Sequence, residues 1–236
     1  MSGHKLLVFD SVGETALEAA RALADAARRA VRQKGRFSLA LAGGTTPRKT
    51  YEAFAELPDV PWGAIDFYFG DERAVPRDDP DSNYRLCRES LFDRQSIEDA
   101  CIFRMAGDAD DLEAAARDYE AVLPKAFDLV LLGMGEDGHT ASIFPGSPTF
   151  TETERRVMVV TGPKPPPTRL TLTPRVLEAA LEVFVLVTGS GKAAALASAL
   201  EGPRDTTALP VQIVKNRTFL VDRAAASKLE SAREQR

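Results

Sequence analysis

The sequence predicts an α/β protein in which a mostly parallel sheet carries helices on both faces. Short apolar runs alternate along the chain with longer segments of helical periodicity. Several of these runs are nearly continuous in Val, Leu, Ile and Phe, which is typical of strands covered on both faces. Four of the runs end directly in a glycine-containing turn, and turns at the carboxyl ends of strands bind ligands in open α/β sheets.

The apolar runs have the length of strands. None approaches the roughly 20 residues that cross a bilayer, and the first is too short for the apolar part of a signal peptide, so we expect a cytoplasmic protein with no membrane partner. The expected strands are Leu6–Phe9, Ser38–Leu41, Ile65–Phe69, Leu129–Leu132, Met158–Val160, Val183–Val187, Gln212–Val214 and Thr218–Val221, the last of them at an edge of the sheet.

Helices are expected between these strands. Over Glu14–Gln33, apolar residues recur at helical spacing and arginines alternate with acidic residues on the other faces, which favours a solvated face over an anion-binding patch. Residues 1–236 contain no long linker and no internal repeat, so a single domain is expected. The other expected helices are Arg48–Glu56, Asn83–Phe92, Leu112–Val122, Arg175–Ala180, Lys192–Leu200 and Ala224–Ala232.

Composition narrows the kind of ligand. The chain is 44% hydrophobic and 28% charged, with a formal net charge of -5. It therefore has no general positive field that would draw nucleic acid, and an anionic ligand must be held by a local cluster of donors. Cys87 and Cys101 fit neither a disulfide framework nor a usual metal pattern. One central histidine with one nearby carboxylate also makes a poor set of metal ligands.

Two glycine turns favour an anion. Ala42–Pro47 opens a helix, where Gly44 allows close approach and Thr45 and Thr46 supply hydroxyl groups. Helix starts of this kind bind phosphate, although an ordinary strand-to-helix turn uses similar residues. The later turn that ends in Lys192 lacks the spacing of a P-loop or of a dinucleotide fingerprint. These turns therefore favour phosphate over a nucleotide.

For two charged segments, the sequence does not decide between ligand binding and a structural role. Gly70–Arg73 follows a strand, and side chains such as Asp71 and Arg73 are costly to desolvate there unless they pair with each other or serve a ligand. A proline-rich segment then carries Lys164 and Arg169, which either face a ligand or belong to a rigid connector.

The turn Gly135–Thr140 gathers an imidazole, a carboxylate and glycines at the end of a buried strand. A histidine side chain in general titrates near neutral pH and can take a proton from water, which makes His139 a candidate base. Asp137, two residues away, can orient or polarise it. A histidine that merely caps the next helix is the alternative, but the crowding of glycines at a strand end favours chemistry.

These segments together resemble the 6-phosphogluconolactonase family, which is related to the glucosamine-6-phosphate deaminases. The family's AGGTTP-type loop, GDER segment with a DSNY stretch, GMGxDGHTASIFPG segment, PKPPPxRxTLT segment and TGxGKA loop match this chain in order from about Leu39 to Ala193. They appear here as Ala42–Pro47, Gly70–Arg73 with Asp81–Tyr84, Gly133–Gly146, Pro163–Thr173 and Thr188–Ala193.

The resemblance implies a modified Rossmann-like domain of the NagB/RpiA type. It also implies hydrolysis of 6-phospho-D-glucono-1,5-lactone to 6-phosphogluconate, the second step of the oxidative pentose phosphate pathway, without a cofactor or metal. The segment Val211–Asn216 looks shorter than the family's loop and is not expected to touch the site. The resemblance makes His139 the general base beside Asp137, puts Arg73, Arg169 and Lys192 on the phosphate or the polar ring, and lines the same pocket with Gly44, Thr45 and Thr46.

Two other functions remain open from the sequence. A deaminase or isomerase on the same fold would use Asp71 or Glu72 to move a proton at C2 of the sugar and His139 to open the ring. A non-catalytic sugar-phosphate sensor would use the same anion-binding loops, because a fold does not dictate a function. The oligomeric state stays open between a monomer and a weak homodimer.

Overall fold

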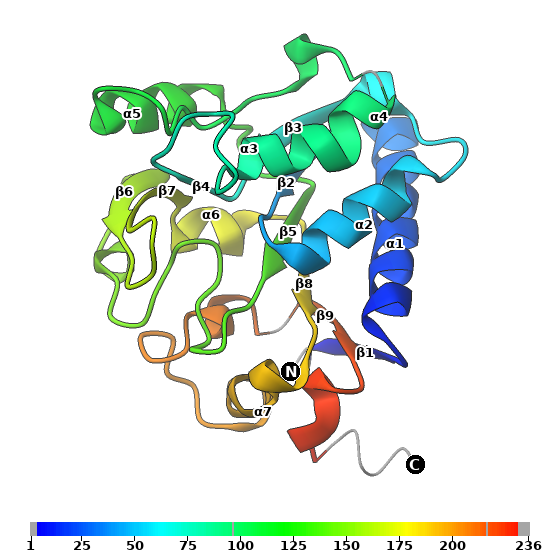
Figure 1. Ribbon diagram of the computed structural model, residues 1–236, viewed down its shortest axis with the longest axis vertical. Helices are drawn as coiled ribbons and strands as arrows, with labels where there is room; N and C mark the ends of the chain where they lie inside the picture. Colours follow the sequence, from blue (N-terminus) through cyan, green and yellow to red (C-terminus); the bar gives the residue numbers. More distant parts are fainter. Residues whose placement is uncertain (1–3, 96, 216, 231–236) are drawn as a thin grey trace.

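The computed structural model describes residues 4–95, 97–215 and 217–230. Its main sheet has six parallel strands in the order β1-β9-β8-β5-β2-β3 (Figure 1). The predicted α/β class is confirmed. The strands are β1 (Lys5–Phe9), β2 (Phe37–Leu41), β3 (Ile65–Phe69), β5 (Leu129–Gly133), β8 (Glu182–Val187) and β9 (Thr218–Asp222).

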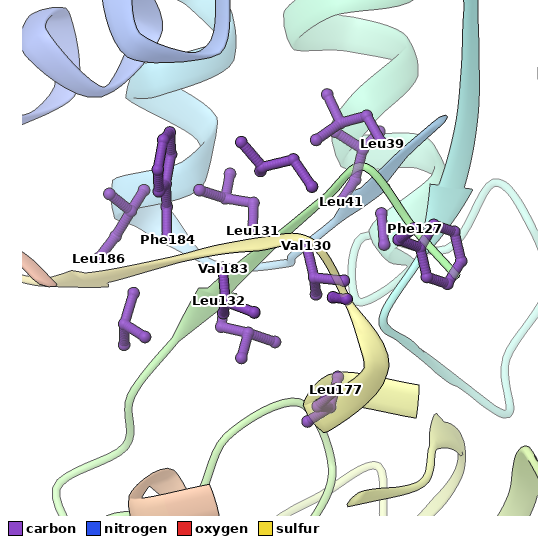
Figure 2. Close-up of a cluster of buried hydrophobic side chains, with 14 of the residues drawn as sticks. Leu39, Leu41, Phe127, Val130, Leu131, Leu132, Leu177, Val183, Phe184 and Leu186 are labelled. Atoms are coloured by element: carbon purple, nitrogen blue, oxygen red, sulfur yellow. The ribbon is translucent and has the colours of Figure 1, made fainter. Parts of the chain in front are cut away.

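Helices cover this sheet on both faces because neighbouring side chains of a strand point to opposite sides. Leu131 and Phe184 point toward α1 and α2, whereas Val130 and Val183 point to the other side, where Leu177 of α6 lies (Figure 2). The main helices are α1 (Val12–Lys34), α2 (Thr45–Ala55), α3 (Asn83–Cys87), α4 (Asp93–Gln95), α5 (Leu112–Val122), α6 (Pro174–Ala179) and α7 (Ala193–Glu201).

Helix α1 begins and ends at residues that the sequence specifies. The Ser11 side chain accepts a hydrogen bond from the Glu14 N–H, and Gly35, at φ 83°, ends the helix in the left-handed region. On α1, Arg21 pairs with Glu18 and Arg28 with Asp25 on the solvated face, as expected of a surface role. Within the described residues, none of the helices has the length and apolar character needed to cross a membrane.

A second, antiparallel sheet lies beside the main one, and the sequence interpretation did not separate the two. Its order is β4-β7-β6, with β4 (Asp71–Arg73), β7 (Thr168–Leu172) and β6 (Val157–Thr161). The charged segment expected as a turn is therefore a short strand, and the proline-rich segment leads into another. The expected strand at Met158–Val160 exists, but it belongs to this second sheet.

The expected edge position of Thr218–Val221 is wrong. Strand β9 pairs with β8 on one side and with β1 on the other, so the N-terminal strand β1 forms the edge. This arrangement brings the carboxyl end of β9 next to that of β8. The expected helix at Ala224–Ala232 is a short 3-10 helix, η7 (Ala225–Lys228), and residues 231 and 232 lie outside the described residues.

The expected strand Gln212–Val214 is also wrong. These residues belong to a 3-10 helix, η6 (Pro210–Val214), with proline in its first turn. The buried Gln212 side-chain amide stabilises the 3-10 helix, because it donates to the carbonyls of Ala199 and Pro203 and accepts from the Asp205 N–H. The Gln212 backbone N–H also donates to the Leu209 carbonyl at 2.9 Å, so its backbone is satisfied without a strand neighbour. The remaining helical segment Asn83–Phe92 runs through α3 into a wider π turn, η2 (Arg88–Phe92).

We expect Gln212→Leu to lower the free energy of unfolding by about 1–3 kcal/mol, because it removes the partner of the Asp205 N–H and of the Ala199 and Pro203 carbonyls, of which the Ala199 contact is buried. Urea denaturation measures the change. Gln33→Leu, on the exposed end of α1, is the matched control and should stay within about 0.5 kcal/mol of the wild type. Equal effects of the two substitutions would show that the Gln212 contacts contribute no stability.

Candidate active site

A cavity of about 340 Å³ opens where the four glycine-containing turns meet at the carboxyl edge of the main sheet. The structure brings together nearly all of the residues expected there. Asp137 lies behind His139, within hydrogen-bond distance of it. The residues that line the cavity include Gly44, Thr45, Thr46, Asp71, Arg73, His139, Lys164, Arg169 and Lys192.

The turn between β2 and α2 places backbone close to the cavity. Gly44 is the N-cap of α2 at φ 106°, so a glycine and not a threonine hydroxyl begins the helix. The Thr46 hydroxyl instead bonds the Thr188 hydroxyl at 2.6 Å, which ties this turn to the one after β8. The buried Tyr51 hydroxyl holds the base of the turn, since it donates to the Ala42 carbonyl and accepts from the Ala42 N–H, each at 2.8 Å.

The two acids that follow β3 have different surroundings. Asp71 lines the cavity, and its carboxylate accepts from Ser142 Oγ at 2.6 Å and from Asn83 Nδ2 at 3.2 Å. Glu72 is buried and accepts from the N–H groups of Arg73, Asn83 and Tyr84 and from Ser82 Oγ. Burial raises the pKa of Glu72, and these backbone hydrogen bonds oppose that rise. Glu72 therefore fixes the start of α3.

Arg73 and Arg169 face each other in the antiparallel register of β4 and β7. Like charges in directly opposite positions destabilise a sheet unless an anion lies between or beside them. Arg73 donates to the Asp81 carbonyl, while its buried Nε has no partner in the described part of the chain. Arg169 donates to the carbonyls of Pro166 and Lys164, and burial lowers its pKa. The two guanidinium groups together create a positive electrostatic potential that favours the binding of an anion.

Lys192 adds a further cation from the turn after β8. Burial lowers the pKa of its ammonium, whereas the carboxylates of Glu136 and Asp222 raise it. Lys164 lies on the exposed rim and also lines the cavity. Four basic side chains thus surround one cavity of a protein whose formal net charge is -5, and such a cavity selects anionic ligands.

His139 and Asp137 form a pair within one turn. His139 Nδ1 lies 2.5 Å from Asp137 Oδ1, and the His139 N–H also donates to this oxygen at 3.2 Å. Partial burial raises the pKa of Asp137, but the hydrogen bonds from His139 and the electrostatic interaction with its ring outweigh it and lower the pKa overall. Asp137 is therefore ionised and fixes the proton on Nδ1, which leaves Nε2 as the basic nitrogen.

The conformation of this turn depends on glycine. A Cβ atom on Gly135 would lie 2.1 Å from the His139 ring, and Gly138 adopts φ 78° with Leu209 packed against it. The N–H of Val211 donates to the Gly138 carbonyl at 2.9 Å. Val211 is not among the residues that line the cavity, but its N–H supports the histidine turn from outside. Residue 216 lies outside the described residues.

Several residues of the site were not singled out from the sequence. Asn83 and Glu136 line the cavity, and the Phe144 ring lies 4.8 Å from the His139 ring and 5.6 Å from the Arg169 guanidinium carbon. Asn83 and Phe144 both fall within motifs that carried the family resemblance, which was the available signal. In the part of the chain that the structure describes, no group of three or more His, Cys, Asp or Glu side chains is placed to hold a metal ion.

Comparison with known proteins identifies the class. Residues 10–222 match the family described as glucosamine-6-phosphate isomerases/6-phosphogluconolactonase. The chain is 37% identical to the 6-phosphogluconolactonase of Mycobacterium tuberculosis, over 90% of this chain and 93% of that protein. It is also 37% identical to the 6-phosphogluconolactonase of Synechocystis sp., over 85% of this chain and 88% of that protein. The protein belongs to the 6-phosphogluconolactonase family.

Solved structures show the same fold. The 6-phosphogluconolactonase of Trypanosoma brucei superimposes with a TM-score of 0.82 at 31% identity, over 97% of this chain and all of that one. A monomeric glucosamine-6-phosphate deaminase gives a TM-score of 0.83 at 28% identity, over 95% and 99% of the two chains. The backbone therefore does not separate a lactonase from a deaminase, and the side chains of the cavity must do so.

We expect Gly135→Ala to displace the His139 ring and to destabilise the protein by about 1–3 kcal/mol, as overpacking does. Proton NMR measures the first effect through the resonance of the hydrogen-bonded Nδ1–H, which should be lost. Gly63→Ala, where an added Cβ meets nothing within 4 Å, is the control and should keep both the resonance and the stability. An unchanged resonance in Gly135→Ala would contradict the described packing of the turn.

Proposed function

We propose that this protein hydrolyses 6-phospho-D-glucono-1,5-lactone to 6-phosphogluconate, the second step of the oxidative pentose phosphate pathway, with His139 as general base. The observation that carries the proposal is that His139, backed by an ionised carboxylate, shares one cavity with four basic side chains. A phosphorylated lactone needs both parts, because its phosphate requires cations and its carbonyl requires an activated water. The family membership supports the same substrate class.

The proton chemistry follows from the Asp137–His139 pair. With Nδ1–H donating to Asp137, Nε2 takes a proton from a water molecule as the water oxygen forms a bond to the lactone carbonyl carbon. Asp137 stabilises the imidazolium that results and keeps the ring oriented, which is the role of the acid beside a catalytic histidine. The carbonyl oxygen becomes an oxyanion, and Arg73, Lys192 or backbone N–H groups of the glycine turns stabilise its charge.

The intermediate then collapses. The bond from the carbonyl carbon to the ring oxygen breaks, and His139 returns its proton to that oxygen, which becomes a hydroxyl of the same molecule. The new carboxylic acid loses its proton to solvent at neutral pH. Water is the only co-substrate, and no covalent enzyme intermediate forms.

A deaminase or isomerase would need an acid free to move a proton at C2 of the sugar. Glu72 is poorly suited, because its oxygens already hold three backbone N–H groups and a hydroxyl. Asp71 faces the cavity, and its carboxylate is engaged by Ser142 and Asn83. Release of ammonia from glucosamine-6-phosphate distinguishes this rival from the lactonase, and lactone turnover distinguishes both from a non-catalytic sensor.

We expect His139→Ala to lower kcat for the lactone by about 10²–10⁴-fold, the usual contribution of a general base, while 6-phosphogluconate still binds. Stopped-flow detection of the proton released on hydrolysis measures the rate. The other histidine, His4, directly precedes β1 and its ring lies against Phe219, so His4→Ala is the control and should turn over normally. A His139→Ala enzyme that retained a near-normal rate would refute the general-base role.

A further inference from the structure

A buried carboxylate lies behind the cavity and has no part in the proton transfer. Asp222 ends β9 and is only 3% exposed. Its oxygens accept hydrogen bonds from the Gly189 N–H at 3.0 and 3.1 Å and from the Ala225 N–H at 2.7 Å. Within the described residues it forms no ion pair. Burying a carboxylate costs desolvation free energy, which suggests that the contacts of Asp222 have a structural or functional role.

One contact of Asp222 is with Gly189, whose backbone conformation is unusual. It follows β8 at φ 91° and is the N-cap of the 3-10 helix η5 (Ser190–Lys192). An added Cβ would meet nothing within 4 Å, so glycine is needed there for its backbone conformation and not for space. Both oxygens of Asp222 hold the N–H of this one residue. Asp222 therefore fixes the direction in which the chain leaves β8 toward Lys192.

Lys192 is the side chain that this turn delivers to the cavity. Burial and the charge of Lys164 both lower the pKa of its ammonium, and the carboxylates of Glu136 and Asp222 act in the opposite sense. Glu136 is exposed and lies against Gly191. Asp222 acts from the protein side, where solvent screens its charge least.

We propose that Asp222 is a positioning residue for phosphate binding, which holds the turn at Gly189 so that the Lys192 ammonium faces the anion in the cavity. The inference rests on the proposed binding of a sugar phosphate and concerns only the anion-binding half of the site. Because β9 lies inside the sheet beside β8, its carboxyl end is where such a support can reach the turn.

Titration calorimetry with inorganic phosphate and with 6-phosphogluconate tests the proposal without relying on turnover. We expect Asp222→Asn to weaken the binding of both by about tenfold, the lower end of the loss seen at metal sites when a residue that supports a ligand is removed. In lactone assays KM should rise while kcat stays within about threefold, because Lys192 in this proposal meets the phosphate and Arg73 or the backbone N–H groups meet the oxyanion. The control is Asp128→Asn, which should leave both affinities unchanged. Asp128 is a buried carboxylate just before β5, at the amino end of the strands, where it accepts from the Ser38 N–H and hydroxyl and pairs with Lys34.

A second pair of variants tests the same turn with Asp222 intact. Gly189→Ala places a side chain at φ 91°, and Gly35→Ala does so at φ 83° at the end of α1, where an added Cβ likewise meets nothing within 4 Å. Both substitutions carry similar backbone strain. We expect only Gly189→Ala to weaken phosphate binding, again by about tenfold, and this pair decides the matter if Asp222→Asn does not fold.

The proposal is overturned if Asp222→Asn and Gly189→Ala bind inorganic phosphate as tightly as the wild type. A loss of stability in Asp222→Asn that matches the loss in Asp128→Asn does not change this conclusion, because only phosphate affinity tests the positioning role. Failure of the proposed function looks different. In that case the wild type binds 6-phosphogluconate but does not hydrolyse the lactone, and the loss of binding in the two variants still supports the positioning role.

Discussion

The repulsion between two arginines that face each other across neighbouring strands is the main electrostatic constraint on the site. Arg73 and Arg169 lie in directly opposite positions of β4 and β7, where like charges repel. Carbonyl oxygens accept hydrogen bonds from each guanidinium, but no carboxylate neutralises the pair through an ion pair among the described residues. The small antiparallel sheet thus keeps two guanidinium groups at the carboxyl edge of the main sheet, where Asp71, Asp81 and Glu72 act on Arg169 without forming an ion pair with it. An anion bound beside the two arginines would relieve their repulsion.

The histidine turn is coupled to this field through packing. The Phe144 ring contacts both the His139 ring and the Arg169 guanidinium, so the basic nitrogen and the cation keep a fixed separation. On the other side of the cavity, the Thr46–Thr188 hydrogen bond joins the two glycine turns. Each turn begins where a parallel strand ends, and the common direction of the strands makes the turns converge. Rigid spacing of this kind is what a bound lactone requires.

Local sequence patterns predicted those parts of the structure that are determined by residues close together in the sequence. Apolar runs identified the strands of the main sheet, and the pairing of Asp137 with His139 follows from their spacing within one turn. The partition into two sheets was not predictable in this way, because β4 has only three residues and depends on β7, nearly 100 residues later, for its partner. Gln212 shows the same limit, since its hydrogen bonds, and not its β-branched neighbours, decide the local structure. Asp222 gave no signal in the sequence because its role depends on β9 lying beside β8.

A crystal structure of the protein with 6-phosphogluconate tests the central claim most directly, because it shows which end of the sugar meets the histidine. The account requires the product carboxylate within hydrogen-bond distance of His139 Nε2, with the phosphate held away from it by the basic side chains of the cavity. A complex with the phosphate beside His139, or with C2 of the sugar against Asp71 and the carboxylate remote from the imidazole, would contradict it.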